Sequence, residues 1–242
     1  GGDYKVQQRA IPEKASFRQA FAHYLAKDGA NKLAEQEAAF AFELAPTARN
    51  ARVHLNRLWQ NKNFADSLTA CKEYQRQFPE DQWILRRYAE IFIQLKQYDQ
   101  AISLYRQLIG MSSASKKNII NYFVRIAGLY ARQKLYVDAV AVLKEGITQY
   151  PRTGKLYHVL GVYFRRMDKN EEALHAFKKA VSLNPDNVGF RYQLGLEYRR
   201  HKLEQEALSE WKECLDIRPH FTRCRTGIEQ IRKQFGLSDS GQ

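Results

Sequence analysis

Six histidines and three cysteines are the side chains with the widest range of chemistry, and their spacing favours neither catalysis nor metal binding. The histidines are His23, His54, His158, His175, His201 and His220. They form no HExxH motif, and no Cys or Ser partner of the kind that makes a nucleophile accompanies them. Cys71, Cys214 and Cys224 show no CxxC or Cys/His ligand spacing. We therefore predict no catalytic residue and no metal site.

Phosphate-binding and cofactor motifs are also missing from the sequence. No GxGxxG or Walker-type loop occurs. Glu171 and Glu172 lie close to His175, but acidic residues are common at the start of an exposed helix, where the helix dipole favours them. The sequence therefore predicts a non-enzymatic protein without a cofactor.

The chain is strongly basic, with 39 Lys and Arg, 26 Asp and Glu, and a formal net charge of +13. This excess favours an acidic partner: an acidic peptide segment, a polyanion, a membrane surface or nucleic acid. No run approaches the roughly 18 apolar residues that a membrane span requires, so we expect a soluble chain, with cytoplasm and periplasm both open. Because the sequence begins Gly-Gly-Asp, we expect that the native start is missing and that a signal, anchor, membrane helix or further domain could precede it.

The prolines divide the chain into units of similar length. They are Pro12, Pro46, Pro79, Pro151, Pro185 and Pro219. Neighbouring prolines are 34, 33, 72, 34 and 34 residues apart, and the gap of 72 equals one unit of 34 and one of 38. Because proline cannot continue a helix, each proline is expected to mark the end of a helical unit.

The unit from Gly154 to Asn187 has the clearest internal pattern. One stripe of large residues at helical spacing contains Tyr157, Leu160 and Phe164. A second stripe contains Ala173, Phe177 and Ala180, and the small residues Gly161, Ala173 and Ala180 would allow two helices to approach closely. This order of large, small and helix-breaking residues resembles the tetratricopeptide repeat, a pair of antiparallel helices of about 34 residues.

The resemblance implies an all-α, right-handed superhelical solenoid of about six helix pairs with a C-terminal capping helix. The expected repeats are 14–47, 48–81, 82–119, 120–153, 154–187 and 188–221. Residues 222–235 are expected to cap the last repeat, whose apolar face would otherwise be exposed. Residues 1–13 are expected to be flexible and 236–242 disordered. Four extra residues near Ser112–Lys117 should lengthen a connection, and change the local stacking angle or present a loop, or simply be tolerated.

Two cysteines fall on inward-facing positions of these repeats, Cys71 and Cys214. We therefore expect the cysteines to be small buried core residues. A Cys214–Cys224 disulfide that pins the last helix is the alternative.

In the family that the chain resembles, the first helix of each repeat lines a concave groove through a fixed set of positions. Mapped onto this sequence, they give the candidate partner-binding residues Arg49, Arg52, Asn56, Trp59, Arg86, Glu90, Arg132, His158, Arg165 and Tyr192. The same positions include Trp83, Asn121, Lys155, Arg166, Arg199 and Arg200. The groove is therefore expected to be basic, and guanidinium groups bind carboxylates or phosphates through paired hydrogen bonds.

Arg52, Asn56, Trp59 and Arg86 are the preferred contacts, because an exposed tryptophan among arginines would have no packing role on that face. For Arg165, Arg166, Arg199 and Arg200, a favourable position at a helix C-terminus explains the residue type equally well. A subset of the family binds terminal carboxylates through a Lys/Asn clamp. Arg52 and Asn56 match it loosely and Arg125 matches it well, but Arg87 and Asn121 do not, so the standard clamp is not expected.

The sequence thus predicts an interaction scaffold that binds a partner protein or peptide, with an acidic segment, and that could act in the assembly of a larger complex. Binding of RNA or another polyanion is the alternative, since helical-repeat proteins can read single strands. An envelope assembly factor and homo-oligomerisation through the terminal repeats are further settings for the same scaffold.

Overall fold

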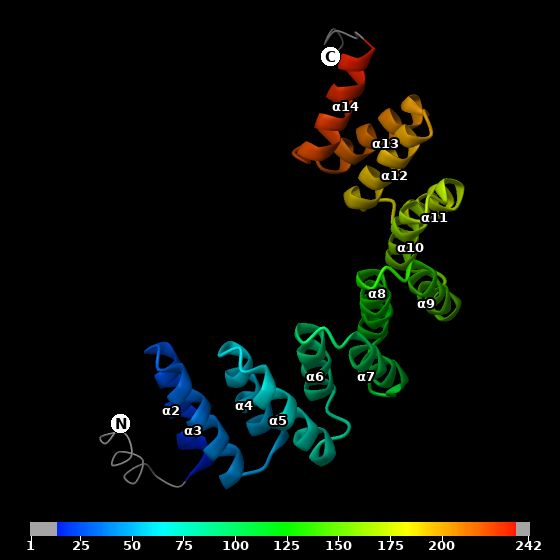
Figure 1. The fold of residues 1–242 in the computed structure, drawn as a ribbon. Coiled ribbons are helices and arrows are strands. Elements are labelled where there is room, and N and C mark those ends of the chain that lie inside the picture. Colours follow the sequence, from blue (N-terminus) through cyan, green and yellow to red (C-terminus); the bar gives the residue numbers. More distant parts are fainter. Residues whose placement is uncertain (1–13, 236–242) are drawn as a thin grey trace. The chain divides into compact units, whose positions relative to one another are not determined.

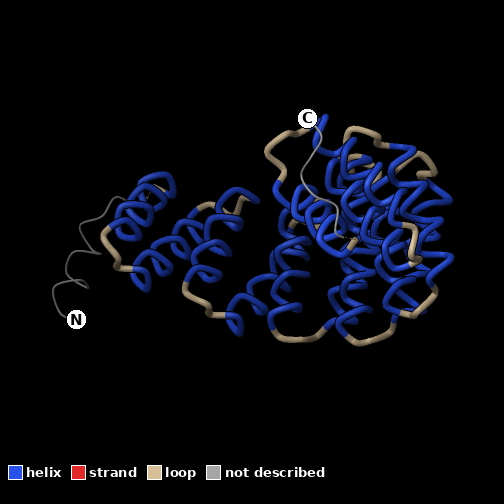
Figure 2. Tube along the Cα trace, turned by 90° about the horizontal axis from the view of Figure 1, so that it is seen from above, coloured by secondary structure: helices blue, strands red, loops and turns tan. Residues whose placement is uncertain are grey.

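The computed structural model describes residues 14–235, and all regular elements in that range are α-helices (Figure 1, Figure 2). The helices are α2 (Ala15–Lys27), α3 (Asn31–Leu44), α4 (Ala48–Gln60), α5 (Phe64–Gln77), α6 (Gln82–Gln94), α7 (Tyr98–Gly110), α8 (Lys116–Arg132), α9 (Tyr136–Gln149), α10 (Gly154–Arg166), α11 (Asn170–Leu183), α12 (Val188–Arg200), α13 (Glu204–Ile217) and α14 (Thr222–Gln234). The predicted all-α repeat architecture is confirmed. The expectations for residues 1–13 and 236–242 fall outside the described residues.

The two helices of each pair are joined by a tight turn with a left-handed residue. These residues are Gly29, Lys62, Lys96, Lys134, Asp168 and Lys202, with φ between 56° and 81°. In the turn after α6, the amide of Gln97 donates to the carbonyl of Phe92 at 2.8 Å and that of Lys96 donates to Ile93 at 3.1 Å. This pair of bonds satisfies the last carbonyls of the helix and turns the chain back on itself.

Of the residues predicted to pack inside the pair α10–α11, all but the half-buried Tyr157 form its core. Ala173, Phe177 and Ala180 are fully buried, and Leu160 and Phe164 are nearly so. A Cβ atom at Gly161 would lie 3.0 Å from the ring of Phe177. The helices therefore approach as closely as the small residues of the sequence predicted.

The chain divides into two compact units, residues 1–115 and 116–242, called here the N-terminal and C-terminal units. In the described range the N-terminal unit contains α2 to α7 and the C-terminal unit contains α8 to α14.

The four extra residues near the start of the C-terminal unit lie in a helix. Helix α8 has 17 residues, whereas α6 and α10 have 13 each. Because an α-helix has about 3.6 residues per turn, four residues add about one turn to α8. The connection before α8, residues 111–115, is only one residue longer than the connection 150–153 before α10, so the insertion lengthens the helix more than the connection.

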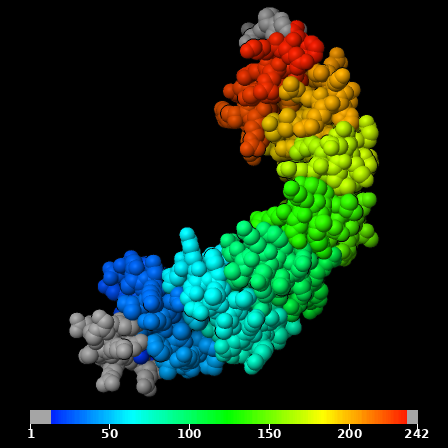
Figure 3. All heavy atoms as spheres, in the orientation of Figure 1, coloured from blue at the N-terminus to red at the C-terminus, as the bar shows by residue number. Residues whose placement is uncertain are grey.

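The last helix, α14, packs on the preceding pair as a cap, and α12 to α14 form one continuous packed body (gold to red in Figure 3). Its Gly227, Ile228 and Ile231 are buried against the core that surrounds Trp211. A Cβ atom at Gly227 would lie 2.6 Å from the indole of Trp211, so this position requires glycine.

Cys214 and Cys224 form a disulfide in this core, with their Cα atoms 6.6 Å apart. Both are buried core residues, as expected, but they are paired in the disulfide that was given as the alternative and are not free thiols. Cys71 is a buried free cysteine, as expected.

Candidate functional site

In the N-terminal unit, Arg52 of α4 forms an ion pair with Asp81, the N-cap residue of α6. Its Nη2 and Nε atoms donate to Oδ2 of Asp81 at 2.6 and 3.0 Å. The other carboxylate oxygen of Asp81 accepts hydrogen bonds from the amides of Trp83 and Ile84 and so caps α6. Arg52 therefore links two repeats, and its guanidinium group is only partly available to a ligand.

The ring of Trp59 packs against the guanidinium group of Arg87, which also contacts the ring of Trp83. The guanidinium carbon of Arg87 lies 4.6 Å from the ring centre of Trp59 and 5.0 Å from that of Trp83. Trp59 also packs edge-on against Phe64, with 5.5 Å between ring centres. The expectation that Trp59 is exposed and has no packing role is wrong, because the arginine of the following repeat covers it.

Arg87 also brings two other candidate residues together. It donates to Oδ1 of Asn56 and to Oε2 of Glu90, both at 3.0 Å. The polar side chains of this face are thus held mainly by contacts within the unit. Among the described residues, Arg49 is exposed and Arg86 half-buried, and neither has an ion pair or ring contact.

In the C-terminal unit, Arg165 and Tyr192 line one cavity of about 780 Å³, called here the arginine cavity. Its lining consists of Arg165, Arg166, Tyr192, Gln193, Leu196, Arg199, Arg200 and Arg223. The arginines come from the C-terminal ends of α10 and α12 and from the first turn of α14. No carboxylate is among these lining residues.

Several contacts hold the walls of the arginine cavity in place. Nη1 of Arg165 donates to Gln193 at 3.3 Å, and Nη1 of Arg199 donates to Gln230 of α14 at 3.0 Å. The guanidinium carbon of Arg223 lies 6.0 Å from the ring centre of Tyr192. Arg166 and Arg200 are exposed. The cavity therefore combines three restrained guanidinium groups with two that point into solvent.

One carboxylate, Glu197, lies buried next to the arginine cavity. Its Oε2 is 3.7 Å from Nη1 of Arg165 and its Oε1 is 3.9 Å from Nε2 of His201. Burial raises the pKa of Glu197, although the charges of Arg165, Arg200 and His201 oppose the change. Burial also lowers the pKa of Arg165. Glu197 is fully buried and is not among the residues that line the cavity.

His158 lines a second cavity of about 790 Å³, called here the lysine cavity. Its lining consists of Lys116, Lys117, Ile120, Asn121, Arg152, Thr153, Gly154, Lys155, His158, Val159, Asn184, Asn187 and Phe190. His158 stacks on Phe190 with 4.8 Å between ring centres. Burial and the nearby charge of Arg165 lower the pKa of His158, which favours the neutral ring.

The predicted residues of the C-terminal unit lie in three places. Arg165 and Tyr192 share the arginine cavity, His158 lies in the lysine cavity, and Arg132 is exposed at the end of α8 and lines neither. Arg223 was missed, because it belongs to α14, outside the repeat positions from which the candidates were chosen. Its only signal was the basic sequence around Cys224.

The described residues contain no group of three or more His, Cys, Asp or Glu side chains able to hold a metal ion. Within the same residues, no helix combines the length and apolar character needed to cross a membrane. The chemistry that the two cavities offer is the binding of anionic groups by guanidinium and ammonium donors.

Comparisons with known proteins place the chain among helical-repeat proteins. Family models described as tetratricopeptide repeat match residues 58–111 and 154–187. No curated protein sequence gives a significant match.

Solved structures show a similar fold. The C-terminal part of a TPR repeat-containing protein from Cytophaga hutchinsonii has a TM-score of 0.66 and 12% identity, covering 93% of this chain and 92% of its own. MamA from Desulfovibrio magneticus has a TM-score of 0.54 and 20% identity, covering 72% and 96%. YrrB, described as a TPR protein with an unusual peptide-binding site, has a TM-score of 0.53 and 14% identity, covering 79% and 97%. The two matched segments therefore identify tetratricopeptide repeats in this chain, and the solved structures show that the chain shares the fold of such repeat proteins.

Proposed function

We propose that this chain is a non-enzymatic scaffold that binds an acidic segment of a partner protein in its C-terminal unit. The observation that carries the proposal is the arginine cavity, in which five arginines and no carboxylate line one open surface. Guanidinium groups pair with carboxylates through two parallel hydrogen bonds, and such charge-assisted bonds are stronger than neutral ones. Arg166 and Arg200 are exposed and are the expected first contacts.

The lysine cavity extends the proposed contact surface along α10. His158 and Arg165 are seven residues apart and therefore lie on the same face of this helix, about 10 Å apart along its axis. An extended peptide spans that distance with about three residues. A single partner segment can therefore reach both cavities.

The two cavities differ in the chemistry that they offer to such a segment. Half-buried Ile120, Val159 and Phe190, one from each of α8, α10 and α12, form the apolar part of the lysine cavity. Lys116, Lys117, Arg152 and Lys155 surround them. The best-matched ligand carries carboxylates for the arginine cavity and, a few residues away, an apolar side chain flanked by a further acidic group.

Peptide recognition is favoured over nucleic-acid binding because the aromatic ring in the arginine cavity, that of Tyr192, already packs against other side chains. Single-stranded nucleic acids bind to aromatic side chains on which bases can stack. The ring of Tyr192 already packs against Trp211, with 6.3 Å between ring centres, and lies near the guanidinium of Arg223. The similar protein YrrB, described as having an unusual peptide-binding site, supports peptide recognition on this type of scaffold.

The test is a binding titration of the purified chain with a fluorescent oligoglutamate peptide and, in parallel, with a fluorescent single-stranded oligouridylate. Fluorescence anisotropy should show salt-dependent binding of the peptide and a loss of about tenfold or more in affinity in the variant Arg166→Glu/Arg200→Glu. The matched control is Arg49→Glu/Arg132→Glu, which has the same change in net charge outside both cavities.

Equal weakening in the two double variants would show that net charge alone attracts the peptide, and it would reject the arginine cavity as the site. Tighter binding of the oligouridylate than of the peptide, lost in the Arg166→Glu/Arg200→Glu variant, would replace the proposal with nucleic-acid binding.

A further inference from the structure

The capping helix α14 forms part of the wall of the arginine cavity. It contributes Arg223 to the lining, and its Gln230 accepts the hydrogen bond from Arg199. A smaller adjoining cavity of about 190 Å³ lies between α12 and α14 and shares Tyr192, Leu196 and Arg223 with the larger one. The arginine cavity therefore depends on where the first turn of α14 lies.

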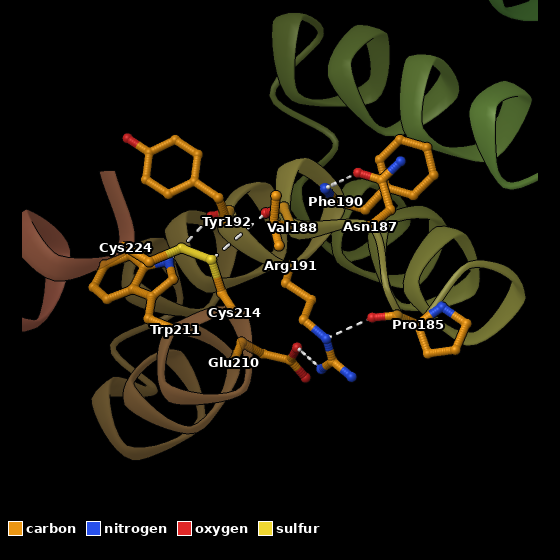
Figure 4. The surroundings of a disulfide bond; sticks show 10 residues. All are labelled: Pro185, Asn187, Val188, Phe190, Arg191, Tyr192, Glu210, Trp211, Cys214 and Cys224. Carbon is orange, nitrogen blue, oxygen red and sulfur yellow. Dashed lines mark hydrogen bonds and ion pairs between the residues drawn. A yellow bond between two sulfur atoms is a disulfide. The ribbon is translucent and has the colours of Figure 1, made fainter. Parts of the chain in front are cut away.

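The Cys214–Cys224 disulfide joins the last turn of α13 to this first turn of α14 (Figure 4). Cys224 directly follows Arg223, and consecutive side chains of a helix point in different directions. Cys224 is fully buried beside Trp211, while Arg223 is exposed and lies near the ring of Tyr192. Fixing Cys224 in the core thus fixes the backbone from which Arg223 extends.

The other restraints on this turn are non-covalent. The N-cap residue of α14, Phe221, makes no side-chain capping hydrogen bond, but its ring packs on the core and its centre lies 6.3 Å from the ring centre of Tyr192. The side chain of Arg225 donates to the carbonyl of Pro219 at 2.9 Å, in the connection before the helix. The main apolar contacts of α14, through Gly227, Ile228 and Ile231, lie one to two turns further along the helix. They can hold the helix on the core while leaving its first turn less restrained.

We propose that the Cys214–Cys224 disulfide is a positioning bond for Arg223, so that the arginine cavity is complete only in the oxidised protein. This inference rests on the proposed function, because it concerns the affinity of the same cavity for an acidic ligand. Reduction by an external dithiol breaks the S–S bond: two electrons and two protons convert the cysteines to thiols, and the dithiol becomes a disulfide. Because disulfides persist in oxidising compartments and cytosolic thiols reduce them, binding is tied to the redox state of the surroundings.

The experiment measures anisotropy with the fluorescent oligoglutamate peptide before and after reduction of the full chain with dithiothreitol. Reduction is expected to weaken binding to the level of the oxidised Arg223→Ala variant, a loss of about three- to tenfold. Reduction should have no further effect on Arg223→Ala, and Cys214→Ser/Cys224→Ser should bind like the reduced protein. Cys71→Ala controls for the third cysteine and should respond to reduction as the unchanged chain does.

The outcomes separate this inference from the proposed function. If the oxidised chain does not bind oligoglutamate, the proposed function fails. If it binds equally well before and after reduction, the function stands and the positioning role is rejected. Loss of helical circular dichroism on reduction, with a loss of affinity greater than that of Arg223→Ala, would also reject it, because the unit would then have unfolded.

Discussion

Arg165 and Glu197 form an ion pair beside the arginine cavity, with 3.7 Å between Nη1 and Oε2, and Glu197 is fully buried in the described structure. Neither carboxylate oxygen of Glu197 has a hydrogen-bond partner among the described residues. A buried carboxylate without hydrogen bonds is costly in its charged form. This relationship couples the cavity that we propose for ligand binding to the stability of its unit.

The variant Glu197→Gln is expected to change how stability depends on pH. Burial raises the pKa of Glu197 above its ordinary value of 4.5. The carboxyl group of Glu197 therefore binds a proton more tightly in the folded chain than in the unfolded chain. Its contribution to the free energy of unfolding is complete below about pH 4.5 and is lost as pH rises through the raised pKa. The free energy of unfolding of Glu197→Gln should increase relative to that of the unchanged chain between pH 4.5 and pH 7.

Urea denaturation at several pH values measures this difference. Glu229→Gln, at an exposed position of α14, is the control. Its free energy of unfolding should differ from that of the unchanged chain by the same amount at each pH. A difference for Glu197→Gln that does not vary with pH would contradict the coupling.

His54 is expected to make the N-terminal unit less stable as pH falls, which is the opposite pH dependence to that of Glu197. Burial lowers its pKa to about 4, although Asp66 opposes the change, and its Nδ1 lies 2.6 Å from the hydroxyl of Tyr74. The imidazole of His54 binds a proton more readily in the unfolded chain than in the folded chain. Its contribution to the free energy of unfolding is therefore present above about pH 6.5 and is lost as pH falls toward 4. The loss amounts to no more than about 3 kcal/mol.

Thermal unfolding between pH 7 and pH 4.5 tests this prediction. His54→Gln should reduce the acid-induced fall in melting temperature, whereas His23→Gln, at an exposed position of α2, should leave it unchanged. An equal fall in all three proteins would show that His54 is not responsible.

The left-handed lysines of the turns predict a stabilising substitution. Lys96 has φ of 59°, a conformation that costs a residue with a side chain about 1–2 kcal/mol and glycine much less. Lys96→Gly should therefore raise the free energy of unfolding by about 1 kcal/mol, as measured by urea denaturation. Lys72→Gly, at an exposed position inside α5, is the matched control and should lower it by about 1 kcal/mol. A loss of stability in Lys96→Gly would contradict the role assigned to the turn.

The sequence was sufficient to predict the helix pairs, because the residues that define them are close together in the chain. The stripe of Leu160 and Phe164, the small Gly161 and the breaker Pro185 act within one unit, and their pattern gave the all-α repeat fold. The extra turn of α8 could not be distinguished from a longer loop, since four residues fit either.

The candidate site was harder to predict, because its chemistry depends on contacts between repeats. Trp59 is exposed on its own helix, and only the position of Arg87 in the following repeat covers it. Arg165 and Tyr192, which were chosen by their repeat positions, line the arginine cavity, but Arg223 and the disulfide depend on how α14 packs on α13. The pairing of two cysteines requires a distance that spacing along the chain does not give.

The apolar part of the lysine cavity predicts a preference among acidic peptides. An oligoglutamate peptide that contains one leucine should bind more tightly than the same peptide without it, because Ile120, Val159 and Phe190 can bury the added side chain. Burial of a leucine side chain contributes about 1.5–3 kcal/mol when complete, and about tenfold in affinity is expected for this open cavity. Competition of both unlabelled peptides against the fluorescent oligoglutamate measures the ratio.

The substitutions Ile120→Ser/Val159→Ser test whether this gain comes from the lysine cavity. They keep the charge of the chain and should remove the preference for leucine while leaving the affinity for plain oligoglutamate within about twofold, since the arginine cavity is unchanged. A preference for leucine that survives these substitutions would place the apolar contact elsewhere. Equal weakening of both peptides would mean that the two cavities do not contribute separately, and that the arginines alone do not account for binding of the acidic groups.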